Sequence, residues 1–182
     1  GLFAAMARYH LILVGGDMLR STELNLGLQI IGTVSAGKAL LRSNAKPGDD
    51  IYVSGSLGLA ASAVATLKQE RNEHAKLTAA QAAALYRPPI HIAFAQALPE
   101  LCHAAMDLSD GLLLDLQRLL TASGVGAVIH CEKLPLAESV DESMALSGGE
   151  DYALLFTAPA AVAAKLQALA TAEGCVISCI GS

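Results

Sequence analysis

The sequence predicts an α/β protein, with α+β character, in which helices pack against a sheet. Short apolar runs that end at turn residues alternate along the chain with longer segments of helical periodicity. Hydrophobic residues make up 53% of the chain and alanine is used heavily, which suits helices packed closely against a sheet. The length of 182 residues is enough for one or two domains with a core.

Composition and charge exclude several classes of protein. No apolar run reaches the roughly 18 to 20 residues that span a bilayer, and no signal peptide is visible. The net charge is −5 without a basic stripe, which argues against a nucleic-acid partner. The four cysteines form no Cys-x-x-Cys pair, and no histidine is placed to complete a zinc site. We therefore expect reduced thiols in a cytoplasmic protein.

The start of the chain predicts one helix and two strands. Residues 1–10 have the pattern of the end of an amphipathic helix. Residues 11–17 predict a buried strand that ends in a Gly-Gly turn, which would place Asp17 at a strand end, where α/β sheets commonly bind ligands. An ordinary turn aspartate is an equally good interpretation. Residues 24–34 alternate leucine and isoleucine with other residues and predict a long strand.

A domain boundary is predicted near Ser43, because Pro47-Gly48 is a strong turn signal shortly after it. Residues 1–42 would then be the C-terminal part of an N-terminal domain, and residues 43–182 a second domain. Arg42 lies just before the boundary, from which it could reach into a cleft between domains. A surface arginine is the alternative.

The second domain is predicted to begin with a strand at residues 51–55 and a small-residue helix from Ser56. Thr78 is predicted to cap a helix over residues 79–86, and Pro89 to open another that ends before Pro99. The remaining elements are a strand at 127–131, a strand at 152–157, a helix at 159–172 that begins with a proline, and a strand at 175–180.

The stretch from Ala104 to Asp115 has the strongest chemical signal. Asp107, Ser109 and Asp110 lie where an apolar run gives way to a helical pattern that Gly124 closes. Ser109 or Asp110 could be the N-cap, and a helix N-terminus favours phosphate. Two carboxylates would repel phosphate unless a cation such as Mg²⁺ lay between them, so a magnesium–nucleotide site is one interpretation. An N-cap beside a solvated aspartate is the other.

A second acidic stretch, Ser147-Gly-Gly-Glu-Asp-Tyr152, follows a flexible turn. Glu150 and Asp151 are adjacent acids at a Gly-Gly turn, an arrangement that costs stability unless the acids are solvated or bound. The turn either presents an acid to a ligand or is an ordinary solvated hairpin.

Taken in order, these stretches resemble thiamine-monophosphate kinases. The resemblance rests on Gly15-Gly-Asp17, Ala39 to Asp49, Ile51 to Gly55, Arg87-Pro88, the Asp-Leu-Ser-Asp-Gly-Leu run from Asp107 and the Ser-Gly-Gly-Glu-Asp-Tyr run from Ser147. The last two are the most specific. The fold implied is that of aminoimidazole-ribonucleotide synthetase and its relatives, built from two α/β domains, with a mixed sheet against helices in the second.

The resemblance implies transfer of the γ-phosphoryl group of ATP to thiamine monophosphate, with Mg²⁺ and without a protein nucleophile. It implies that Gly16, Asp17, Arg42 and Ser109 contact the nucleotide, that Asp17, Asp107 and Asp110 ligate the metal, and that Glu150 contacts the substrate. It also implies a homodimer. Positioning and charge neutralisation are what phosphoryl transfer mainly requires.

The chain departs from the family pattern in several places. Met18 and Leu19 stand where two threonines are usual, and Ile90, His91 and Ala95 replace a Pro-Arg pair and a glycine. The family's N-terminal Gly-Asp-Asp and Ser-Thr-Asp motifs are absent, as is its C-terminal end, so we expect either a partial sequence or a truncated relative. Two alternatives stay open, namely another ATP-dependent synthetase or dehydratase of the superfamily and a non-catalytic binding domain.

Overall fold

The computed structural model describes residues 1–70 and 76–182. The chain forms two compact units, Gly1–Thr33 and Val34–Ser182. The first unit contains one helix, α1 (Leu2–Arg8), as the amphipathic pattern predicts. No helix in the described residues is both long and apolar enough to cross a membrane.

The two strands predicted in residues 11–17 and 24–34 are wrong, because both segments lack regular secondary structure and have no strand partner in the described residues. Their apolar side chains are exposed, with Ile12 at 85% and Leu26 at 86%. A strand exists only when a neighbour takes up its backbone hydrogen bonds. Within the described residues neither segment has such a neighbour, so alternation alone was not sufficient.

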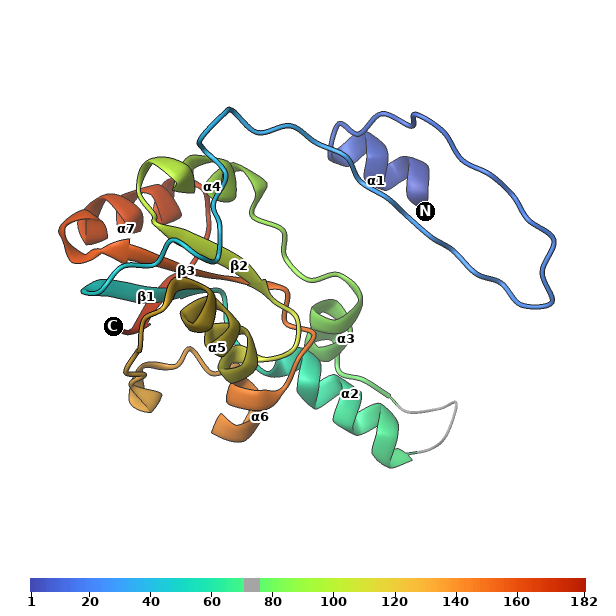
Figure 1. Ribbon diagram of the computed structural model, residues 1–182. Coiled ribbons are helices and arrows are strands. Elements are labelled where there is room, and N and C mark those ends of the chain that lie inside the picture. The colour runs from blue at the N-terminus through green and yellow to red at the C-terminus, as the bar shows by residue number, and fades with distance from the viewer. Residues whose placement is uncertain (71–75) are drawn as a thin grey trace. The chain divides into compact units, whose positions relative to one another are not determined.

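The second unit is built on a four-stranded sheet with the order β2-β3-β1-β4 (Figure 1). The named strand pairs are antiparallel, and a parallel bridge joins Leu57 to Leu136 beside them. The strands are β1 (Asp49–Ser54), β2 (Ala104–Leu108), β3 (Ala153–Pro159) and β4 (Ile177–Gly181). The α/β class is confirmed.

Six helices in the described part of the second unit connect the strands. They are α2 (Leu59–Glu70), α3 (Ala79–Tyr86), α4 (Ile92–Ala97), α5 (Leu112–Ser123), α6 (Glu142–Ser147) and α7 (Ala163–Ala172). Short 3₁₀ turns span Leu98–Glu100, Cys131–Lys133 and Ala160–Val162.

Several helix limits follow from their caps. Thr78 caps α3 as predicted, and its hydroxyl and the Gln81 side chain form a reciprocal capping box. Gly124 ends α5 in the left-handed conformation with φ 69°. The prediction for α4 began three residues early, because Ile92 and not Pro89 opens the helix.

Side chains of β1 point alternately to two cores on opposite faces of the sheet. Ile51 and Val53 pack with the buried leucines of α5 on one face. Tyr52 packs on the other face with Phe94 of α4 and Phe156 of β3. The rings of Tyr52 and Phe156 stack with centroids 5.3 Å apart. Helices therefore cover both faces, and the sheet ends are left for the connecting loops.

Residues 127–131 differ from the predicted strand. Ile129 makes an isolated bridge to Gly181, and the backbone of Val128 exchanges hydrogen bonds with Ser182. The chain then turns into the 3₁₀ segment at Cys131, which ends the pairing. The four cysteines are free thiols; Cys102 and Cys175 are buried, and Cys131 and Cys179 are exposed.

Candidate functional site

The two acidic stretches lie at one end of the sheet. Because β3 pairs antiparallel with both β2 and β1, the C-terminal ends of β2 and β1 and the start of β3 meet at the same end of the sheet. Leu108 is paired with Ala153, and the Ser54 hydroxyl accepts a hydrogen bond from the Leu154 N–H over 2.8 Å. Asp107–Asp110 and Glu150–Tyr152 therefore lie in adjacent loops.

Two backbone hydrogen bonds join these loops directly. The Glu150 N–H donates to the Ser109 carbonyl over 2.9 Å, and the Tyr152 N–H donates to the Leu108 carbonyl over 2.8 Å. The contact is so close that a Cβ added to Gly149 would lie 2.5 Å from the Ser109 oxygen. Glycine is thus required at this position for the two loops to meet.

The backbone of the second loop is held in an unusual conformation. Glu150 and Tyr152 have φ angles of 71° and 48°, in the left-handed region that residues with a side chain rarely adopt. Such conformations cost roughly 1–3 kcal/mol each and persist where the surroundings enforce them. Here the two hydrogen bonds to the first loop provide that constraint and point the Glu150 side chain to solvent.

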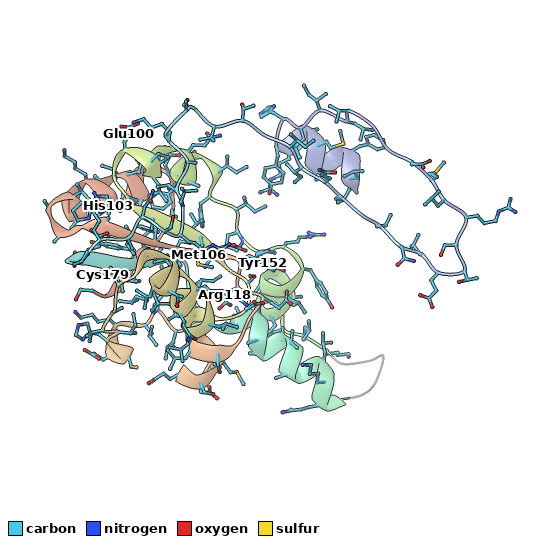
Figure 2. The ribbon with its side chains drawn as sticks, viewed as in Figure 1. Glu100, His103, Met106, Arg118, Tyr152 and Cys179 are labelled. Atoms are coloured by element: carbon cyan, nitrogen blue, oxygen red, sulfur yellow. The ribbon has the colours of Figure 1, made fainter. Side chains whose placement is uncertain are left out.

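Three carboxylates act on the phenol of Tyr152, which shows that they lie near one another. The pKa of Tyr152 is raised first by the charge of Glu150, then by burial and a hydrogen bond from the phenol to Glu150, and further by the charges of Asp107 and Asp110. Figure 2 shows Tyr152 and Arg118 at the same end of the sheet, away from His103. This end of the sheet therefore carries a patch of three exposed carboxylates.

The start of α5 differs from the prediction that Ser109 or Asp110 is its N-cap. Gly111 occupies that position, with φ 114°, and no side chain caps from there. Instead, the Asp115 carboxylate turns back from within α5. Its Oδ2 atom accepts hydrogen bonds from the N–H groups of Ser109 (3.0 Å) and Asp110 (2.9 Å).

Asp115 is the residue that sequence reasoning missed. It is 0% exposed and lies on the apolar face of α5 among three buried leucines, Leu112, Leu116 and Leu119. An aspartate on the core-facing side of an amphipathic helix is a signal in itself, since an unpaired buried carboxylate is costly. The position of Asp115, four residues after the cap residue Gly111, could have pointed to it.

Arg118 connects the buried acid to the exposed one. Its Nη1 nitrogen donates to Asp115 Oδ1 over 2.8 Å and to Asp110 Oδ2 over 2.5 Å. Asp107 and Asp110 themselves are exposed and Ser109 is half-buried. The structure thus brings Asp107, Ser109, Asp110 and Glu150 together, as a group of residues predicted from two separate stretches.

Asp151 lies beside this patch but faces the opposite way. Both of its carboxylate oxygens accept the Gly58 N–H at 3.0 Å, at the start of α2. Burial raises the pKa of Asp151 to about 6, although hydrogen bonds from Gly58 and Ala60 oppose the shift. Asp151 also lines a cavity of about 430 Å³ whose wall includes Arg87 and His91. It therefore anchors its loop to α2.

The other predicted site residues are not part of these two loops. Gly16 and Asp17 belong to the first unit and are exposed, where the Asp17 carboxylate accepts the Met18 N–H over 2.8 Å. Arg42 is exposed, and its carbonyl accepts a hydrogen bond from the Ser123 hydroxyl at the last residue of α5. Asp110 precedes the first turn of α5, so the backbone of Arg42 lies at the other end of this helix, roughly 18 Å along it at 1.5 Å per residue.

Oxygen donors of the patch suit a hard cation that keeps water and phosphate ligands. Within residues 1–70 and 76–182, no group of three or more His, Cys, Asp or Glu side chains could hold a metal ion by itself. Mg²⁺ is usually bound by one or two carboxylates together with substrate phosphates. Asp107 and Asp110 fit that requirement, because both are exposed carboxylates in a negatively charged patch.

Comparison with known proteins gives a consistent result. Residues 46–182 match the family AIR synthase related protein, C-terminal domain. The chain is 40% identical over 189 residues to thiamine-monophosphate kinase of Salmonella typhimurium, covering 99% of this chain and 58% of that protein. The chain therefore spans just over half the length of this curated relative.

Solved structures agree with the sequence comparison. The crystal structure of thiamine-monophosphate kinase from Stenotrophomonas maltophilia superposes with a TM-score of 0.76 at 35% identity, covering 81% of this chain and 51% of that one. The structure of AaThiL complexed with AMPPCP and TMP gives a TM-score of 0.64 at 32% identity, covering 78% and 47%. Because residues 46–182 match its C-terminal domain, the chain belongs to the family of AIR synthase related proteins.

Proposed function

We propose that the protein to which this chain belongs transfers the γ-phosphoryl group of ATP to thiamine monophosphate, giving ADP and thiamine diphosphate. The observation that carries the proposal is the direct joining of the two acidic loops by the Glu150–Ser109 and Tyr152–Leu108 hydrogen bonds. The relatives named thiamine-monophosphate kinase, and a similar structure that holds AMPPCP and TMP, support the choice of substrates.

The chemistry requires positioning more than a protein nucleophile. The attacking atom is an oxygen of the acceptor's own phosphate, whose second pKa of about 6 leaves it ionised at neutral pH. That oxygen forms a bond to the γ-phosphorus as the bond to the ADP oxygen breaks. No side chain needs to remove a proton.

We assign Asp107 and Asp110 as ligands of Mg²⁺, and Ser109 between them as a nucleotide contact. Bound Mg²⁺ would reduce the charge repulsion between the two phosphate groups. Gly16, Asp17 and Arg42 are proposed nucleotide contacts, with Asp17 also a metal ligand, on the basis of the family resemblance. The division of domains near Ser43, the homodimer and the cytoplasmic location are likewise proposals from that resemblance.

Glu150 is proposed to contact the thiamine part of the acceptor. Its carboxylate is exposed at the loop that faces the Asp107–Asp110 stretch, and thiamine carries a cationic thiazolium ring. An acid placed beside a fixed positive charge is attracted to it most strongly where water is partly excluded.

The test is a product assay with the full-length protein. ATP, thiamine monophosphate and Mg²⁺ are incubated with it, and the products are followed by ³¹P NMR. We expect a diphosphate ester to appear together with ADP, and no ADP when thiamine monophosphate is omitted. ADP formed equally without the acceptor, or a product that is not a diphosphate, would favour another activity of the superfamily. Absence of any turnover would favour a binding domain.

A further inference from the structure

Asp115 is a buried charge for which the fold provides a complete set of partners. It is 0% exposed, and an ionised carboxylate in such a position is costly unless it is paired and hydrogen-bonded. One oxygen accepts two backbone N–H groups and the other accepts Arg118 Nη1. No side-chain nitrogen or oxygen buried among the described residues is left without a partner.

The backbone partners of Asp115 belong to the loop that carries the proposed metal ligands. Its Oδ2 atom holds the N–H groups of Ser109 and Asp110, between the end of β2 and the cap residue Gly111. These two hydrogen bonds to one buried oxygen restrict the backbone conformation of the loop. The Asp110 side chain is then directed outward, where 49% of it is exposed.

Arg118 extends this control to the carboxylate of Asp110 itself. The same guanidinium nitrogen contacts Asp115 Oδ1 at 2.8 Å and Asp110 Oδ2 at 2.5 Å. Because Asp115 is buried and fixed, it determines where the guanidinium lies, and the guanidinium determines which oxygen of Asp110 stays open. Planar arginine can make both contacts in a set geometry that a lysine ammonium does not reproduce.

We propose that Asp115 is a positioning residue for the metal site, which sets the backbone at Ser109–Asp110 and, through Arg118, orients the Asp110 carboxylate toward a divalent cation. The inference rests on the proposed function, since it takes Asp110 as a metal ligand. Residues that orient metal ligands in this way typically contribute about 10- to 100-fold to metal affinity.

A second buried carboxylate provides the matched control. Asp49 is 6% exposed and accepts hydrogen bonds from the Lys46 N–H (3.0 Å) and the Thr157 hydroxyl (3.1 Å), with His103 Nδ1 at 2.8 Å. It lies at the opposite end of the sheet, where Asp49 is paired with Pro159. A role in stability alone should be common to both aspartates, whereas a role in metal binding should belong to Asp115.

The experiment compares Asp115→Asn and Asp49→Asn in the full-length protein. Mn²⁺ binding is measured from the free-ion EPR signal with AMPPCP present and against an AMPPCP solution without protein, and melting temperature is measured by circular dichroism. We expect both variants to melt at lower temperature, and only Asp115→Asn to raise the Mn²⁺ Kd, by about tenfold. The Mg²⁺ concentration for half-maximal turnover should rise in parallel. An unchanged Mn²⁺ Kd in folded Asp115→Asn, or no Mn²⁺ binding by the wild type, overturns the proposal.

A second variant covers the case in which Asp115→Asn does not fold. Arg118→Lys keeps the positive charge on a side chain that is 42% exposed, but replaces the planar guanidinium, one nitrogen of which contacts both carboxylates, with a tetrahedral ammonium on a differently shaped side chain. We expect a folded protein with weaker Mn²⁺ binding, and wild-type affinity would overturn the proposal. The Mn²⁺ measurement needs no turnover, so it stays distinct from the test of function. A wild type that binds Mn²⁺ but makes no thiamine diphosphate would refute the proposed kinase activity alone.

Discussion

The N–H of Glu150 donates a hydrogen bond to the carbonyl of Ser109 over 2.9 Å, which joins two acidic stretches that lie about forty residues apart in the sequence. The bond connects the loop after β2 with the loop before β3. Glu150, which follows the Gly-Gly turn, thereby faces Asp107 and Asp110, which precede α5. The candidate site is thus a product of strand pairing, because β2 and β3 are neighbours in the sheet.

Gly149→Ala should separate the two loops. A Cβ at this position would lie 2.5 Å from the Ser109 oxygen and 3.3 Å from the Asp110 Cα, and neither is a flexible side-chain end. We expect a loss of about 1–3 kcal/mol in the free energy of unfolding, measured by urea denaturation. Gly126→Ala is the control, since nothing lies within 4 Å of its Cβ position. Equal stability of the two variants would show that the contact is not tight.

Asp107→Asn should abolish most of the turnover of the full-length protein while leaving the fold intact. Asp107 is exposed at the end of β2, so the change removes charge and little packing. We expect kcat to fall by about 100-fold or more, with a melting temperature close to that of the wild type. Glu173→Gln, an exposed acid at the end of α7, should have wild-type kcat. Full activity in Asp107→Asn would remove Asp107 from the mechanism.

Glu150→Gln should affect one substrate and not the other. The substitution keeps size and hydrogen-bonding capacity but removes the charge proposed to face the thiazolium ring. We expect the KM for thiamine monophosphate to rise by about tenfold, the loss of one charge-assisted contact, with the KM for ATP nearly unchanged. Steady-state kinetics with each substrate varied separately checks this. A rise confined to the KM for ATP would place Glu150 on the nucleotide side.

Local signals predicted the second unit well. Thr78, Gly124 and the periodic leucines of α5 determine helix limits through contacts within a few residues, and such contacts can be inferred from sequence. The strands β1 and β3 are short apolar runs bounded by turn residues, and they too were predicted. The acidic loops could be named from the residues, but not joined, because their contact depends on the strand order.

Two features were not predicted, and each has a physical reason. Residues 24–34 have the alternation of a strand, yet pairing needs a partner, and the described residues supply none. The helical pattern places Asp115 at a core position of α5. Its hydrogen-bond partners, however, are backbone N–H groups that lack another partner only in the folded loop. Gly111 as cap leaves the N–H groups of Ser109 and Asp110 open, and Asp115 accepts both.

Asp151→Asn should change how stability depends on pH. Burial raises the folded-state pKa of Asp151 from 3.8 to about 6, so the folded protein holds this proton more tightly than the unfolded chain does. The contribution of protonated Asp151 to the free energy of unfolding is fully present below pH 3.8 and is lost as the pH rises through about 6. Asparagine never ionises and can still accept the Gly58 N–H. We expect the variant to exceed the wild type in free energy of unfolding by about 1 kcal/mol at pH 7.5, after allowance for solvent screening, and the difference to shrink toward pH 4.5.

Urea denaturation across this pH range measures the difference between Asp151→Asn and the wild type. Asp141→Asn is the control of opposite sign, because hydrogen bonds from Ser143 and Met144 lower the pKa of Asp141. A difference between wild type and Asp151→Asn that stays constant with pH would contradict the assignment.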